Sequence, residues 1–161
     1  MYVKIIQEMI EYFREDVRRI NHALKVFSFS RIISESEKLN KFYREVIDYS
    51  SILHDIGIKE AERKYNSSSG RYQEIEGPPV ADKILSKFNI KNKIKERVSF
   101  IIGNHHTYDK IDDIDFQVIV ESDFIVNIYE DSIKRDVIKK IRKKFFKTSS
   151  GLRILNSMYR I

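Results

Sequence analysis

The sequence predicts an all-α fold, a single compact helical bundle formed by residues 1–161 as one domain. Turn-forming residues are scarce, since the chain has only five glycines and two prolines. Apolar residues recur every three or four positions along most of the chain, which places them on one face of a helix. No segment shows the apolar–polar alternation of a half-buried strand, and no unit repeats at a fixed period. The length suits one domain with a core of its own.

Two helical stretches are predicted in the first third of the chain. The first has an apolar face made of Ile6, Ile10, Phe13, Val17, Ile20, Leu24 and Phe27. A second apolar face begins at His22, and Asn21 either caps a new helix there or lies within a continuous one. The second stretch starts after Asn40, a residue type that favours the N-cap, and ends in the sequence ILHDIG at residues 52–57. Gly57 is expected to take the C′ position that stops this helix.

A polar loop is predicted over residues 65–77, and further helices are predicted after it. Pro78 and Pro79 are expected to open the next helix, because proline is favoured in the first helical turn. Another helix is predicted to align His105 with three apolar positions, Ile94, Val98 and Ile101. A helix over about 116–130 follows. A basic helix and a short closing segment carry the remaining apolar positions, Val137, Ile138, Ile141, Phe145, Leu152, Leu155 and Tyr159.

The composition limits the classes of protein to which the chain can belong. No apolar run approaches the roughly 20 residues that cross a bilayer, and the N-terminal residues lack the order of a signal peptide. A cytoplasmic location without a membrane partner is therefore expected. With no cysteine there is no disulfide, thiolate nucleophile or Cys-ligated zinc. The net charge of +6 suits an anionic partner. For most of these charges, however, we favour solubilising lysines spread over helix faces.

Asp123 and the histidines are the most informative polar residues. On a helix, Asp123 lies in the middle of an apolar face, where an unpaired carboxylate would cost several kcal/mol. It therefore either pairs with a buried cation such as Arg19 or binds a metal. All four histidines also fall at apolar helix faces or helix ends, at His22, His54, His105 and His106. Imidazole and carboxylate ligands together suit Mn, Fe, Co, Ni or Zn, and Mg where carboxylates dominate.

These residues occur in an order that resembles a known family. His22, then His54-Asp55, then Asp123 resembles the H…HD…D pattern of the HD superfamily of metal-dependent phosphohydrolases, which are all-helical. The resemblance covers about residues 22–130. The sequence IGNHH at 102–106 is similar to the paired histidines of members that hold two metals. The sequence EGPPVADKIL at 76–85 is similar to the segment before the next helix in bacterial members.

The resemblance implies a centre for one divalent ion and leaves open a second ion at an adjoining position. The implied ligands of the first ion are His22, His54, Asp55 and Asp123. Asp55 is expected to bridge to the second ion, whose further ligands are His105, His106 and Glu76. Glu76 is included because Gly77 stands where the HD-GYP type of enzyme has a histidine. Asp55 and Lys59 are the expected catalytic residues. Lys59 resembles the lysine of an HD-IGK pattern, displaced by one position.

Basic and hydroxyl side chains near the HD pair are predicted to bind phosphate oxygens. These residues are Arg19, Lys64, Ser68 and Arg71. Arg19 precedes His22 by about one turn, and the other three lie in or next to the polar loop. Taken singly, each basic residue also suits a solvated surface charge. As a unit, the loop is expected to form part of the pocket rim.

The resemblance implies an enzyme that hydrolyses a phosphomonoester or phosphodiester bond by metal-activated water. Its substrate is expected to be a small phosphorylated molecule of the nucleotide type. The alternative is a non-catalytic sensor that binds a metal or a nucleotide on the same scaffold. A nucleic-acid partner is not expected, because the basic run over residues 139–144 lacks interleaved aromatic residues. A second copy of the chain, forming a homodimer, is left open as a partner.

Overall fold

The computed structural model describes all 161 residues and contains only helices and connecting turns. The elements are α1 (Tyr2–Phe13), α2 (Val17–Ser36), α3 (Lys41–Leu53), α4 (Ile58–Tyr65), α5 (Gly70–Leu85), α6 (Asn92–Ile102), the 3-10 turn η1 (Tyr108–Lys110), α7 (Ile114–Glu130), α8 (Arg135–Phe145) and α9 (Ser149–Tyr159). The predicted all-α class is confirmed. None of the helices combines the length and the apolar character that crossing a membrane requires.

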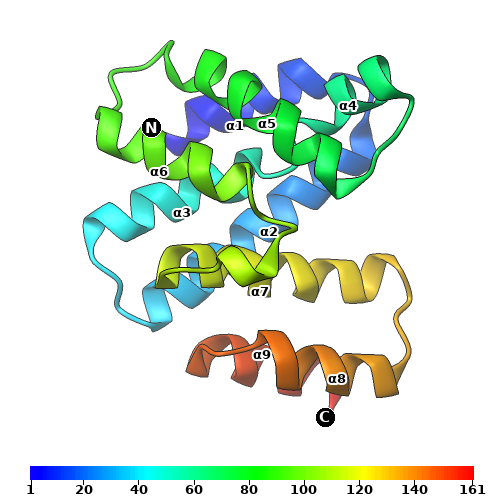
Figure 1. Cartoon of the computed structure of the whole chain (residues 1–161). Coiled ribbons are helices and arrows are strands. Elements are labelled where there is room, and N and C mark those ends of the chain that lie inside the picture. The colour runs from blue at the N-terminus through cyan, green and yellow to red at the C-terminus, as the bar shows by residue number, and fades with distance from the viewer.

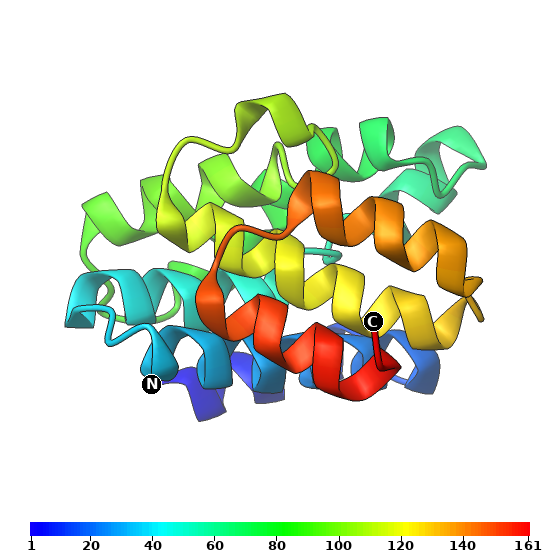
Figure 2. The same ribbon diagram turned by 90° about the horizontal axis from the view of Figure 1, so that it is seen from below.

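Helices α2, α3 and α7 form the centre of the bundle, where each packs against the other two (Figure 1). Helices α1, α4 and α5 lie together on one side, and α6 packs between α3 and α5. On the opposite side, α8 and α9 form an outer layer beyond α7 (Figures 1 and 2). One connected cluster of buried apolar side chains extends from α1 to α9. The polar residues described below are therefore held by helices that share a single core.

The N-terminal apolar face is divided between two helices. The backbone turns at Arg14, which has a φ of 56°, and α2 starts after Asp16, whose carboxylate accepts a hydrogen bond from the Arg19 backbone N–H at 3.2 Å. Asn21 consequently lies inside a continuous α2. Asn40 does cap α3 as predicted, since its side chain accepts from the Tyr43 N–H at 3.1 Å.

The predicted loop over residues 65–77 is wrong for its second half. Helix α5 already begins at Gly70, so that Pro78 and Pro79 lie inside it rather than at its start. The early turns of α5 bury Gln73, Glu76 and Gly77, and this packing outweighs the low helix propensity of their glycine- and proline-rich surroundings. Residues 58–65, for which no element was predicted, form the short helix α4.

Gly57 is needed for a close approach of two backbones, and the predicted C′ role is wrong. Its φ of −75° is an ordinary helical value, which any residue adopts. A Cβ at this position would lie 2.4 Å from the Gly77 nitrogen and 2.5 Å from the Gln73 carbonyl oxygen. The turn that carries His54 and Asp55 therefore lies directly against the backbone of α5.

Gly57→Ala is expected to lower the free energy of unfolding by about 1–3 kcal/mol, because α5 must shift to admit the methyl group. Urea denaturation measures the change. Gly103→Ala is the matched control, since Gly103 also has a helical φ and its added Cβ would come no closer than 3.1 Å to Pro78 Cγ. Equal losses in the two variants would contradict the close approach at Gly57.

Asp48 gives the fold a pH-dependent component of stability. It is buried in α3, and burial raises the pKa of Asp48 to about 6, although Arg31 at 3.3 Å opposes the rise. A folded-state pKa above the unfolded value means that the folded state binds the proton more tightly. The contribution of Asp48 to the free energy of unfolding is therefore fully present below about pH 4, and it is lost as the pH rises towards about 6.

Asp48→Asn is therefore expected to be more stable than the wild type at pH 7, by about 1–2 kcal/mol after allowing for the lost Arg31 contact. The difference should vanish near pH 4, as followed by thermal unfolding across the pH range. Asp112→Asn is the opposite control, because hydrogen bonds from Arg97 lower the pKa of Asp112. A constant difference between pH 4 and 7 would contradict the assignment to Asp48.

Candidate metal centre

Four separate parts of the chain converge on one polar cluster. The contributing residues are His22 in α2, His54 and Asp55 at the end of α3, His105 and His106 in the turn after α6, and Asp123 in α7. They form two groups, each of which has its ligand atoms within 4.8 Å of one another. The first group is His22, His54 and Asp123, and the second is Asp55, His105 and His106. Either group has the size and the donor atoms to hold a metal ion.

The first group is compact and buried. His22 Nε2 lies 3.1 Å from His54 Nε2 and 3.2 Å from Asp123 Oδ1. The distance from His54 Nε2 to the same Asp123 oxygen is 3.6 Å. His54 is fully buried, and His22 is only 7% exposed.

The hydrogen bonds made by the Nδ1 atoms of these two histidines determine which ring nitrogen is free to bind a metal ion. His54 Nδ1 lies 2.9 Å from the Ser51 carbonyl oxygen, which only accepts, so this nitrogen carries the proton. His22 Nδ1 likewise donates to the Glu130 carboxylate at 3.0 Å. In the neutral rings, both Nε2 atoms then direct lone pairs at each other across 3.1 Å. Such an arrangement is stable only with a positive charge at this point, either an added proton or a cation, and it therefore fits a metal ion.

The charges of the cluster also require positive charge, from protons or from a metal ion. Burial by itself would raise the pKa of Asp55, but His54 and His105 hold it below its usual value. Hydrogen bonds from His22 and His54 lower the pKa of Asp123 in the same way against its burial. Burial opposes protonation of His22, yet Asp123 outweighs it and raises the pKa of His22 to about 9. Protons on the histidines balance the two carboxylates in the absence of an ion, and metal binding would displace them.

Asp55 lies between the two groups. Its Oδ2 atom is 3.5 Å from His22 Nε2 and 3.5 Å from His54 Nε2, whereas its Oδ1 atom is 3.3 Å from His105 Nε2. His105 Nδ1 donates to the Ile102 carbonyl at 2.8 Å, so its Nε2 atom is the free one. Each carboxylate oxygen of Asp55 thus faces a different group.

His106 completes the second group on the side of α5. Its backbone N–H donates to Glu74 at 3.0 Å, and its Nε2 atom lies 3.3 Å from the Gln73 side-chain oxygen. Burial and the neighbouring His105 lower the pKa of His106 to about 4. The ring is therefore neutral at pH 7, as a ligand must be.

A cavity of about 450 Å³ opens onto both groups. It is lined by Asp16, Arg18, Arg19, His22, Asp55, Ile58, Ser68, Gln73, His106, Asp123, Asn127, Glu130 and Asp131. This volume lies in the range of small-molecule sites. Two of the predicted phosphate-binding residues, Arg19 and Ser68, thus lie at the cavity. Arg19 is ion-paired with Asp16 and Glu62 and is not the partner of Asp123.

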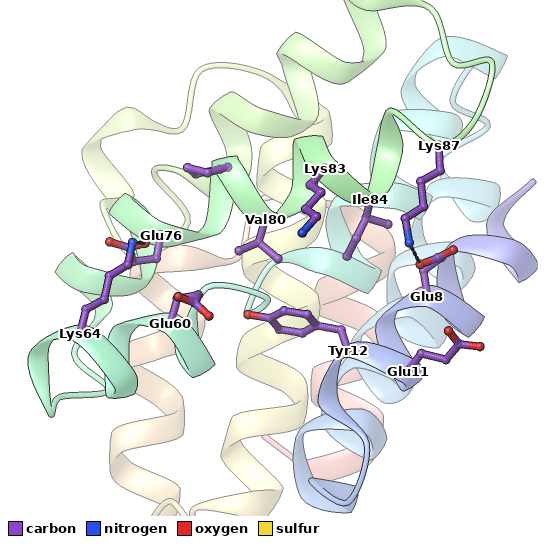
Figure 3. Close-up of a pocket in the computed structure, with 11 residues that line it drawn as sticks. Glu8, Glu11, Tyr12, Glu60, Lys64, Glu76, Val80, Lys83, Ile84 and Lys87 are labelled. Atoms are coloured by element: carbon purple, nitrogen blue, oxygen red, sulfur yellow. Dashed lines mark hydrogen bonds and ion pairs between the residues drawn. The ribbon is translucent and has the colours of Figure 1, made fainter.

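Four predicted site residues lie outside this cavity and outside the two ligand groups, namely Lys59, Lys64, Arg71 and Glu76. Glu76 accepts hydrogen bonds from Lys64 at 2.5 Å and Tyr65 at 2.9 Å. Glu76 and Lys64 line a different cavity, of about 540 Å³, between α1, α4 and α5 (Figure 3). The expected roles of Glu76 as a metal ligand and of Lys64 as a phosphate ligand are therefore corrected. Lys59, expected to be catalytic, donates to the Tyr12 carbonyl at 2.8 Å and does not line the metal-centre cavity.

Arg71 is exposed and does not line the cavity either, so the loop contributes only Ser68 to the rim. The physical reason is the early start of α5, which turns residues 70–77 into a helix. Sequence reasoning also missed Glu130, which orients His22 and is itself bonded to Lys25. Its spacing of seven residues from Asp123 puts both on one face of α7 and would have identified it.

Comparisons with known proteins assign no family to this arrangement. No protein-family model, no curated protein and no solved structure matches the chain. Any inference about the function of the centre therefore depends on the chemistry of its own side chains.

Proposed function

We propose that the protein is a metal-dependent phosphohydrolase of the HD type, acting on a phosphomonoester or phosphodiester bond of a nucleotide-like molecule. The observation that carries the proposal is the position of Asp55. Its two oxygens lie within 3.5 Å of imidazole nitrogens from two different ligand groups. A carboxylate in this position suits a bridge between two divalent ions, which is the arrangement of two-metal hydrolytic sites.

The donor set favours transition metals over Mg. Four of the six ligand residues are histidines and none is a cysteine, a combination that suits Mn, Fe, Co, Ni or Zn. When bound, such ions withdraw charge from a phosphoryl oxygen and lower the pKa of a coordinated water. The occupancy expected from the geometry is one ion in the first group and a second at Asp55, His105 and His106.

The remaining side chains have supporting roles. Hydrogen bonds from Nδ1 to Ser51, Glu130 and Ile102 hold three histidine rings in place. At the mouth of the cavity, Arg18 is exposed and forms no ion pair, whereas Arg19 is already shared between Asp16 and Glu62. Arg18 is therefore the better candidate to bind a phosphate oxygen.

Asp55→Asn is expected to lower the rate of substrate hydrolysis by at least about 100-fold, because the amide cannot bridge two cations. Turnover is measured on nucleotides and on a chromogenic phosphodiester with Mn, Co, Ni, Zn or Mg, and metal content by elemental analysis. Glu76→Gln is the matched control and should retain activity, since Glu76 lies in the other cavity. Full activity in Asp55→Asn would refute the proposal. Metal-loaded wild type that hydrolyses none of the substrates, phosphomonoester or phosphodiester, would favour the sensor instead.

Arg18→Ala is expected to raise KM about 10-fold with little change in kcat, because it removes a charged contact to the bound phosphate. Steady-state kinetics on the best substrate separate the two parameters. Arg71→Ala removes an equal charge from an exposed position outside the cavity and should leave both unchanged. A similar rise of KM in both variants would indicate a general charge effect and exclude a specific contact of Arg18.

A further inference from the structure

The positive charge of the chain is concentrated in one segment. Residues 134–147 contain eight lysines and arginines and one aspartate, a net charge of +7, whereas the whole chain has a net charge of +6. All other residues together are therefore close to neutral, at −1. The sequence interpretation that the basic residues are spread over helix faces does not hold for this segment.

Most of these side chains are exposed, and none forms an ion pair. The exposed ones are Lys134, Arg135, Lys139, Lys140, Lys143, Lys144 and Lys147, here called the α8 basic face. No salt bridge involves any residue of the segment. Some cations of the rest of the chain are paired, since Arg19, Arg31, Arg63 and Arg97 each contact a carboxylate. The α8 basic face thus keeps its charge unneutralised.

The stability of α8 does not explain these charges. Like charges four residues apart, as in the pairs Arg135/Lys139, Lys139/Lys143 and Lys140/Lys144, destabilise a helix by about 0.2–0.5 kcal/mol each. The helix dipole favours cations only in the last turn, which accounts for Lys143 and Lys144. The earlier cations oppose folding of the helix on which they lie.

The apolar side of α8 is already occupied. Ile138 and Ile141 are buried in the core cluster, and Gln117 of α7 donates to the Phe145 carbonyl at 2.7 Å. Helix α8 lies next to α7 on the outside of the bundle (Figure 2), and the residues of its basic face are exposed. A membrane-surface helix needs a free apolar face to insert, and α8 offers only Val137. The partner must therefore be one that contacts positive charge alone.

We propose that the α8 basic face binds the phosphate backbone of a nucleic acid, without reading its bases. Helix α8 has 11 residues and is about 17 Å long, which matches about five steps of a duplex at roughly 3.4 Å each. The lack of interleaved aromatic residues argues against base stacking but not against phosphate contacts. The inference does not depend on the phosphohydrolase proposal, because α8 contributes no residue to the metal-centre cavity.

The test is fluorescence anisotropy of a labelled oligonucleotide of about 20 nucleotides, single-stranded and as a duplex, between about 50 and 300 mM salt. The combined variant Lys139→Gln, Lys140→Gln, Lys143→Gln and Lys144→Gln should bind at least about 10-fold more weakly, with a salt slope smaller by about three. Glutamine is a good helix former, and a circular-dichroism melt verifies that α8 still folds.

The matched control removes the same charge from exposed lysines elsewhere, Lys4, Lys41, Lys83 and Lys91. These four Lys→Gln changes together should leave the affinity within about twofold. Equal losses in the two variants would overturn the proposal, because net charge alone would then explain binding. The absence of wild-type binding at the lowest salt would also overturn it. So would tighter binding to phosphatidylserine vesicles than to either oligonucleotide.

Discussion

The demand for a cation at the point where α2, α3 and α7 meet is the constraint on which the rest of the site depends. Two imidazole nitrogens lie 3.1 Å apart there, next to two carboxylates whose pKa values are held low. Charges removed from water in this way must be balanced locally. The surrounding backbone and side-chain acceptors form hydrogen bonds with the Nδ1 atoms of the histidines. The Nε2 atoms therefore remain free and point towards the centre of the cluster. When a metal ion supplies the positive charge, fewer histidine rings must be protonated than in the cluster without an ion.

The contact between Gly57 and Gly77 determines which residues can join that cluster. It brings the backbone of the turn that carries His54 and Asp55 against α5, where Gln73 lines the metal-centre cavity and Glu76, about one turn later, lines the cavity shown in Figure 3. The four consecutive residues from Gln73 to Glu76 cannot all face the same cavity, because successive residues of a helix point in different directions. The same packing explains why Lys64, which pairs with Glu76, lies outside the centre as well.

Features with a local physical cause were predictable from the sequence. The helical class and the extent of α7 follow from apolar spacing, and the Asn40 cap follows from side-chain chemistry. The order of His22, His54, Asp55 and Asp123 identified residues that the structure brings together. Glu76 and Lys59 were misplaced because their neighbours depend on how helices pack, which periodicity does not encode. The start of α5 was missed for the same reason, since buried packing retains two prolines within a helix.

Charge also sets an order of events at the centre. Five carboxylates line the cavity, those of Asp16, Asp55, Asp123, Glu130 and Asp131, against the two arginines Arg18 and Arg19. Without a metal ion, these carboxylates are balanced only by the two arginines and by protons on the histidines, so the cavity offers an approaching phosphate no excess of positive charge. Cations in the two ligand groups would supply that excess next to the proposed phosphate position. Under the proposed function, a phosphorylated substrate would bind after the metal or together with it, because the acidic lining would hold the cation that attracts the substrate.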